Sequence, residues 1–184
     1  MKHALLFSLF VYSLIHTLSA SAQNYGTFVG LSVGQTRVNL EQPLENDRDS
    51  LGAVGSGVTI GHVFDSNIVT RLNVSAAFNF SLFGTFDRVD LSHLDASIGY
   101  QKKWDRFSLT PKIGFTRYYY KAEEGIFLNP GEEDRAEEDG STFFWGLSAG
   151  YALSSRFTMA LVHKNVNTDF GDYQLNHIDF LVNF

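Results

Sequence analysis

Cysteine is absent from the 184-residue chain, and proline occurs only three times. Without cysteine, the chain has neither a disulfide framework nor a thiolate metal site. The 16 glycines, the 15% aromatic content and the near absence of helix-period apolar stripes favour β-structure. Gly55, Gly57 and Gly61 do not form a phosphate loop, because no helical segment follows them. We therefore expect a β-protein that is held by strand pairing and packing and has no cofactor.

Basic residues are outnumbered. The chain has 14 lysines and arginines against 20 aspartates and glutamates, a formal net charge of −6. A DNA- or RNA-binding protein needs a basic surface that displaces counterions from phosphates. The charge balance has the wrong sign for that role, and we expect no nucleic-acid partner.

The single long apolar run stands at the N-terminus. Lys2 precedes apolar residues from Ala4 to Ile15, and the small residues of Ala20-Ser21-Ala22 follow. This order is typical of a secretory signal peptide, and the run is shorter than the roughly 20 residues of a spanning helix. We expect residues 1–22 to be cleaved, leaving residues 23–184 as one domain with a net charge near −7, since Lys2 is lost and no acid is.

Apolar and polar residues alternate with period two through the mature chain, in segments longer than the five or six residues of a typical soluble strand. The pattern is clearest over residues 68–82, where apolar side chains share one face with Thr70, and polar and small ones dominate the other. It recurs seven more times, near residues 26–34, 55–64, 93–101, 107–116, 145–152, 157–164 and 177–184. We predict an all-β fold, a single antiparallel eight-stranded transmembrane β-barrel.

The connections alternate in length. Short turns are expected at residues 65–67, 102–106 and 154–156, and longer loops near residues 41–52, 84–91, 121–142 and 167–173. Membrane barrels have tight periplasmic turns and longer outer loops. An even number of strands returns both termini to one side, so we expect both to be periplasmic. Pro111 cannot donate to a ladder, which predicts a bulge or a rim position there.

Aromatic residues gather at the expected strand ends, as they do in the belts that flank a membrane. One group is Tyr118-Tyr119-Tyr120 with Phe143-Phe144-Trp145, and another includes Phe64, Trp104 and Phe157. A soluble β-sandwich or a lipocalin-like barrel is the alternative, because alternation does not say which face meets water. The glycine- and serine-rich polar face, the strand lengths and the final phenylalanine favour the membrane barrel.

The last strand resembles the C-terminal signal read by the outer-membrane assembly machinery, an aromatic end with apolar residues two, four and six positions earlier: Phe184, Val182, Phe180 and Ile178. With the signal peptide and the repeated hairpins, the mature chain resembles the small eight-stranded outer-membrane β-barrels, a family that includes OmpX, the membrane domain of OmpA and the opacity proteins. The resemblance implies integration in the outer membrane, with its lipid, lipopolysaccharide and the barrel-assembly machinery as partners. The partner of the surface loops stays open.

An eight-stranded barrel is just wide enough for side chains to fill, so buried charges in its lumen must pair. Folding neighbouring strands about their turns sets Asp95 almost opposite Lys112, and Lys164 opposite His177. Gly61 falls across from Arg71 and leaves it room. From shared parity we predict a lumenal charge network of structural character, formed by Arg71, Asp95, Lys112, Lys164, His177 and Asp179. A gate or proton path is the functional alternative.

His163 shares the parity of Met159 and Leu161 and is expected to face lipid. This resembles the lipid A deacylase barrels, which carry a histidine and a serine two residues apart on the outer wall. Asn165 stands at the second position here, so a hydroxyl nucleophile is missing and the triad logic fails. We therefore expect no catalytic residues, and a lipid A-modifying enzyme is the alternative.

The third long loop carries eight acids between Glu123 and Asp139, with Arg135 as the only base. Such a block is usually a solvated, self-repelling surface loop. A sharper hypothesis is capture of Ca²⁺ or Mg²⁺ by carboxylate oxygens, without the spacing of an EF-hand. The candidate ligands are Glu132, Glu133, Asp134, Glu137, Glu138 and Asp139.

The resemblance to the small outer-membrane barrels implies a non-enzymatic integral outer-membrane protein that serves envelope structure and surface-loop interaction. A narrow porin-like channel is a further alternative.

Overall fold

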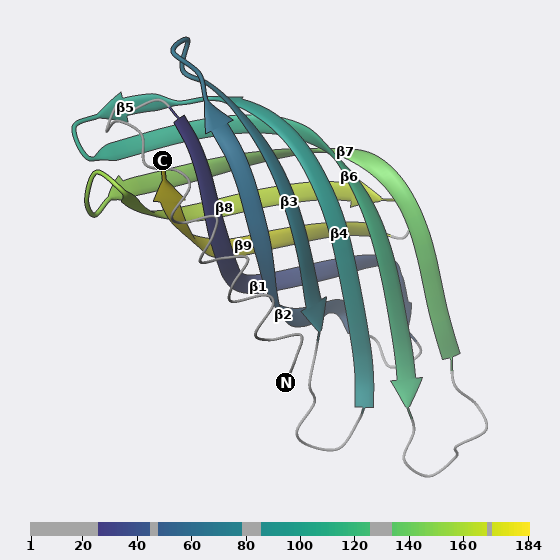
Figure 1. The fold of residues 1–184 in the computed structure, drawn as a ribbon. Helices are drawn as coiled ribbons and strands as arrows, with labels where there is room; N and C mark the ends of the chain where they lie inside the picture. The colour runs from purple at the N-terminus through teal and green to yellow at the C-terminus, as the bar shows by residue number, and fades with distance from the viewer. Residues whose placement is uncertain (1–25, 45–47, 79–85, 126–133, 169–170) are drawn as a thin grey trace, which may run out of the picture.

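A computed structural model describes residues 26–44, 48–78, 86–125, 134–168 and 171–184 (Figure 1). Long antiparallel strands form one curved wall, and neighbouring strands in sequence are neighbours in space. Among the described residues, no helix is long and apolar enough to cross a membrane. The strands are β1 (Gly26–Leu44), β2 (Arg48–Val63), β3 (Ile68–Phe78), β4 (Phe86–Tyr100), β5 (Lys102–Trp104), β6 (Phe107–Gly125), β7 (Asp134–Ala152), β8 (Phe157–Thr168) and β9 (Gly171–Asn183).

The wall closes on itself. The sheet order is β4-β3-β2-β1-β9-β8-β7-β6-β5, and β4 also pairs with β6, which joins the two ends. β4 and β5 both pair with β6 and are separated only by Gln101, so they are two parts of one barrel strand. The result is a closed antiparallel barrel of eight strands, as the alternation predicts. Closure gives every strand two partners and leaves no open edge.

The alternation sorts side chains between lumen and exterior. Inward positions are buried and mostly polar or small, such as Ser32, Thr59 and Thr116. Outward positions carry large apolar side chains that are exposed, for example Leu31 at 59%, Val74 at 59% and Ile113 at 65%. An exposed apolar wall around a polar interior is the reverse of a water-soluble protein and matches a barrel in lipid.

The short turns lie at the same end of the barrel as Gly26, the first described residue, and Phe184, and we call it the terminal end. There the Phe184 N–H donates to the Thr27 carbonyl over 2.9 Å. Asn67 and Asp105 adopt φ of 62° and 52° in two of the turns, a left-handed conformation that asparagine and aspartate tolerate better than most residues. The turns predicted at residues 65–67 and 154–156 are confirmed, whereas the turn predicted at residues 102–106 is shorter, because residues 102–104 pair with β6 as β5.

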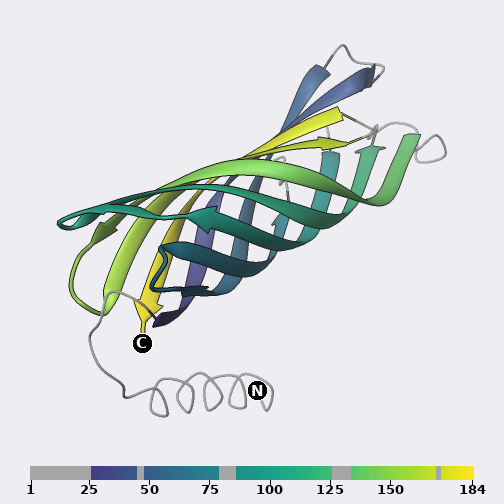
Figure 2. The same cartoon turned by 90° about the horizontal axis from the view of Figure 1, so that it is seen from above.

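At the far end the strands run on further than expected. β1 extends to Leu44, β6 to Gly125, and β7 begins at Asp134, so much of the predicted loops 41–52 and 121–142 is strand. The predicted loops 84–91 and 167–173 are largely strand as well, because β4 begins at Phe86 and β9 at Gly171. Figure 2 shows β1 and β2 leaving the barrel as a pair at this end. The prediction of long loops was wrong here because polar residues also form strand pairs where a neighbouring strand continues beside them, as β6 and β7 do up to the Glu124–Asp134 pair.

Pro111 lies near the terminal end of β6, as its predicted rim position requires, and no bulge occurs there. The register of β6 with β7 runs without a shift through the Pro111–Leu147 pair. On the other side, pairing with β4 stops at Gly99, and pairing with β5 resumes at Lys102. The partner strand is thus interrupted opposite the residue that cannot donate to it.

Candidate functional site

The lumen is the candidate site, since all six residues of the predicted charge network occupy inward positions. They come from strands on every side of the barrel: Arg71 on β3, Asp95 on β4, Lys112 on β6, Lys164 on β8, and His177 and Asp179 on β9. Asp95, Lys164 and Asp179 are 5%, 2% and 1% exposed. Five of the six residues form two clusters, and Lys112 belongs to neither.

The first cluster centres on Asp95. Lys164 Nζ donates to Asp95 Oδ1 over 2.6 Å, and Asn73 Nδ2 donates to Asp95 Oδ2 over 3.2 Å. His93 Nε2 lies 3.6 Å from Asp95 Oδ2 and shares a short hydrogen bond with the Ser75 hydroxyl. The carboxylate therefore has polar partners at both oxygens, which is what a buried charge requires.

The second cluster centres on Asp179. Arg71 Nη1 lies 2.6 Å from Asp179 Oδ2, and His177 Nε2 lies 3.2 Å from Asp179 Oδ1. The Arg71 guanidinium also stands over the Phe28 ring, 5.2 Å from its centroid. Aromatic faces attract cations, so Phe28 supplies a second contact for the same charge.

Both predicted cross-strand pairs were wrong. The register sets Asp95 opposite Thr116 and Lys112 opposite Gly99. On the other side, Lys164 faces Leu175, and Val162 faces His177. The expected pairs assumed turns centred near residues 104 and 170, whereas the observed β5–β6 turn is centred between Asp105 and Arg106. The ion pairs join opposite walls instead, β3 to β9 and β8 to β4.

The predicted register of Gly61 with Arg71 is correct. The space beside Gly61 is filled by another residue, however, because the Phe28 ring lies where a Cβ on Gly61 would be. The absence of a side chain at Gly61 therefore leaves space for the Phe28 ring, and the Arg71 guanidinium stands over that ring.

Aromatic side chains fill the lumen beyond the charged layer. Tyr118, Tyr120, Phe144 and Tyr173 are between 0% and 6% exposed and share one apolar cluster with Leu91. The prediction that Tyr118, Tyr120 and Phe144 belong to an interfacial belt is wrong, because all three are buried. Strict alternation sends them inward and leaves Tyr119 and Phe143 outside, at 39% and 77% exposed. A parity count along β6 and β7 identifies Tyr118, Tyr120 and Phe144 as inward residues.

His163 lies on the outer wall, as expected. Its Nδ1 is 2.8 Å from Asn176 Oδ1, and its ring centroid is 5.6 Å from that of Trp145. A shallow groove of about 470 Å³ passes beside it, and none of the residues that line it is a serine, threonine or acid. The histidine has a polar partner and no hydroxyl to activate.

The acidic segment is largely strand. Glu132 and Glu133 lie outside the described residues, and Asp134, Glu137, Glu138 and Asp139 belong to β7. Tyr118 donates to Glu138 over 2.8 Å, and Arg117 lies 3.7 Å from Asp139. Alternation points adjacent acids to opposite faces, and the described residues contain no group of three acids or histidines that could hold a metal ion.

No protein-family model matches the chain, and no curated protein matches it. Solved structures do. Ail of Yersinia pestis superposes with a TM-score of 0.66 at 11% identity, over 88% of this chain and 100% of that one. Neisserial surface protein A gives 0.58 at 13%, over 86% and 97%. The N-terminal barrel domain of OprF from Pseudomonas aeruginosa gives 0.52 at 14%, over 88% and 100%.

At these identities the likeness concerns architecture. The strand count, the closure and the coverage of whole barrels agree, and they confirm the fold that the last strand and the alternation predicted. The chain therefore has the fold of the small eight-stranded outer-membrane β-barrels.

Proposed function

We propose that the chain is a non-enzymatic integral outer-membrane protein that stiffens the envelope and presents its far end to the cell surface. The observation that carries the proposal is the outer wall of large exposed apolar side chains around a charge-paired lumen. On β3 alone that wall runs from Ile68 to Phe78, 11 residues, and a tilted membrane-spanning strand needs about 9–11.

The proposed orientation has the terminal end in the periplasm and the long strand ends outside. The short turns at the terminal end and the expected signal peptide support it. Lipid and lipopolysaccharide would then cover the apolar wall. Ile178 and Phe180 point outward on β9, at 37% and 52% exposed, and with Val182 and Phe184 form the proposed contact for the barrel-assembly machinery. Surface contact is the proposed role of the far end, and one solved Ail structure contains a heparin analogue.

Membrane integration is tested with the mature chain refolded in detergent. Without boiling, the barrel should migrate faster on an SDS gel than the boiled chain, because a closed sheet offers no edge to the detergent. The same protein should sediment with outer-membrane fractions of cells that express it. A chain that shows no shift and stays soluble without detergent would contradict the proposal.

A narrow channel is the competing function, and conductance separates the two. The lumen contains two cross-wall ion pairs and the buried Tyr118, Tyr120 and Tyr173, so we expect no single-channel steps from the refolded barrel in planar bilayers. A porin refolded in the same way controls for insertion. Reproducible single-channel steps would favour the channel and would contradict the proposal that the charge pairs close the lumen.

A further inference from the structure

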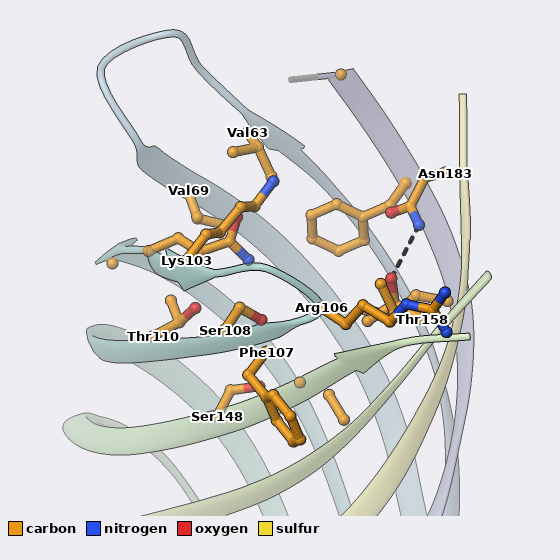
Figure 3. Close-up of a pocket in the computed structure, with 18 of the residues that line it drawn as sticks. Val63, Val69, Lys103, Arg106, Phe107, Ser108, Thr110, Ser148, Thr158 and Asn183 are labelled. Atoms are coloured by element: carbon orange, nitrogen blue, oxygen red, sulfur yellow. Dashed lines mark hydrogen bonds between the residues drawn. The ribbon is translucent and has the colours of Figure 1, made fainter. Parts of the chain in front are cut away.

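A second cavity opens inside the terminal end of the barrel. It has a volume of about 320 Å³, and we call it the vestibule (Figure 3). Its lining is basic and rich in hydroxyl groups, although the whole chain carries a net charge of −6. Asp105 is the one acidic side chain among its lining residues. The basic ones are Arg71, Lys103, Arg106 and Lys112, and the hydroxyl-bearing ones are Ser97, Ser108, Thr110, Ser148, Ser154, Ser155 and Thr158.

Lys112 has no counter-ion of its own. Among the described residues of the charged layer, the carboxylates are those of Asp95 and Asp179, and their closest cations are Lys164 and Arg71, each at 2.6 Å. Among the described residues, no hydrogen bond or ion pair is formed by the Lys112 ammonium. Of the three cations in the predicted charge network, Lys112 is therefore the one without a paired carboxylate.

The wall is shaped to admit this lysine. Lys112 is opposite Gly146 on β7, and a Cβ on Gly146 would lie 3.0 Å from Lys112 Cε. The next inward residue toward the terminal end is Ser148, which is 7% exposed and opposite Thr110. Lys112 thus lines a cavity that is also lined by the hydroxyl groups of Thr110 on its own strand and of Ser148 on β7.

The mouth of the vestibule is basic as well. Figure 3 shows Lys103 over the cavity and Arg106 extending from the β5–β6 turn toward Thr158 and Asn183 on the opposite wall. Cations at the entrance of a low-dielectric cleft raise the local concentration of anions. An anion would pass these two side chains before it reaches Lys112.

We propose that the vestibule binds a small oxyanion of the phosphate class, with Lys112 as its main ligand. Lys112 is half-buried and has no paired carboxylate, and an anion from solution supplies the partner that the chain does not. Lysine is a common point-charge ligand of phosphate, and serine and threonine hydroxyls donate to its oxygens. The inference does not depend on the proposed role at the cell surface.

The test is calorimetric titration of inorganic phosphate into the refolded full mature chain at constant ionic strength. We expect saturable one-site binding that weakens at least tenfold in Lys112→Gln. Lys102→Gln is the matched control, because Lys102 is exposed at the same rim and does not line the vestibule. The heat-dependent gel shift establishes that each variant is folded before titration.

A third variant tests the same site without removing the lysine. Ser148→Asp places a carboxylate beside Lys112 and should abolish phosphate binding while the barrel stays folded. Absence of saturable binding by the folded wild type would overturn the inference, as would equal affinities of Lys112→Gln and Lys102→Gln. A chain that never shows the gel shift would instead contradict the proposed membrane barrel, so the two failures are distinguishable.

Discussion

Asp95→Asn should lower the free energy of unfolding by about 3–5 kcal/mol, the cost of breaking a buried ion pair by removing one partner. Lys164 is only 2% exposed and donates to Asp95 over 2.6 Å. The amide keeps the volume of the carboxylate and removes its charge, so Lys164 is left as a buried cation. His93, at 3.6 Å, loses the same anion.

The measurement is urea unfolding of the barrel in lipid vesicles, followed by the fluorescence of Trp104 and Trp145. Asp172→Asn is the matched control, because Asp172 is exposed on β9, and a surface change of this kind costs less than about 0.5 kcal/mol. The double variant Asp95→Leu with Lys164→Met should recover most of the loss, since it removes both charges. Equal stability of Asp95→Asn and Asp172→Asn would show that the pair is not a structural plug.

Gly61→Ala should destabilise the barrel by about 1–3 kcal/mol, the usual cost of overpacking a filled interior. A Cβ at Gly61 would collide with the Phe28 ring and with the Thr70 carbonyl. Phe28 is 3% exposed and carries the Arg71 guanidinium on its face, so its displacement also disturbs the Arg71–Asp179 pair. The same unfolding assay reports the change.

Gly52 provides the comparison on the same strand. A Cβ there meets nothing closer than the Gln35 amide at 3.8 Å, so Gly52→Ala should stay within about 0.5 kcal/mol of the wild type. In a Phe28→Ala background, Gly61→Ala should lower the free energy of unfolding by less than it does in the wild type, because the colliding ring is gone. If both glycine variants behave alike, the close approach of Phe28 to Gly61 is not what limits substitution.

The two cross-wall pairs suggest why an eight-stranded barrel keeps charges in its interior. Arg71–Asp179 joins β3 to β9, and Lys164–Asp95 joins β8 to β4. Each pair links strands that do not hydrogen-bond to each other, whereas the strand ladders link only neighbours. The pairs therefore hold the cross-section of the barrel and fill the lumen at the same time.

The local sequence pattern was enough to predict the strands that form the wall of the barrel. Alternation over segments such as 68–82 predicted the strands, their inward and outward faces and the tight turns at one end, because the side-chain period of a strand is a property of the backbone. It also placed all six charged residues in the lumen and set Gly61 across from Arg71. Strict parity further sends Tyr118 and Tyr120 inward, a step that the clustering of aromatic residues obscured.

The contacts across the lumen depend on how the sheet closes into a barrel. Which charges meet across the lumen depends on the stagger of all eight strands around the barrel, and a shift of one turn moves every later partner. Only the closed structure pairs Arg71 with Asp179 and Lys164 with Asp95, and leaves Lys112 facing the vestibule. It likewise turns the acidic segment after Asp134 into strand, because pairing with β6 continues beyond the apolar wall. Contacts between distant walls are set by the geometry of the whole sheet, and no local period encodes them.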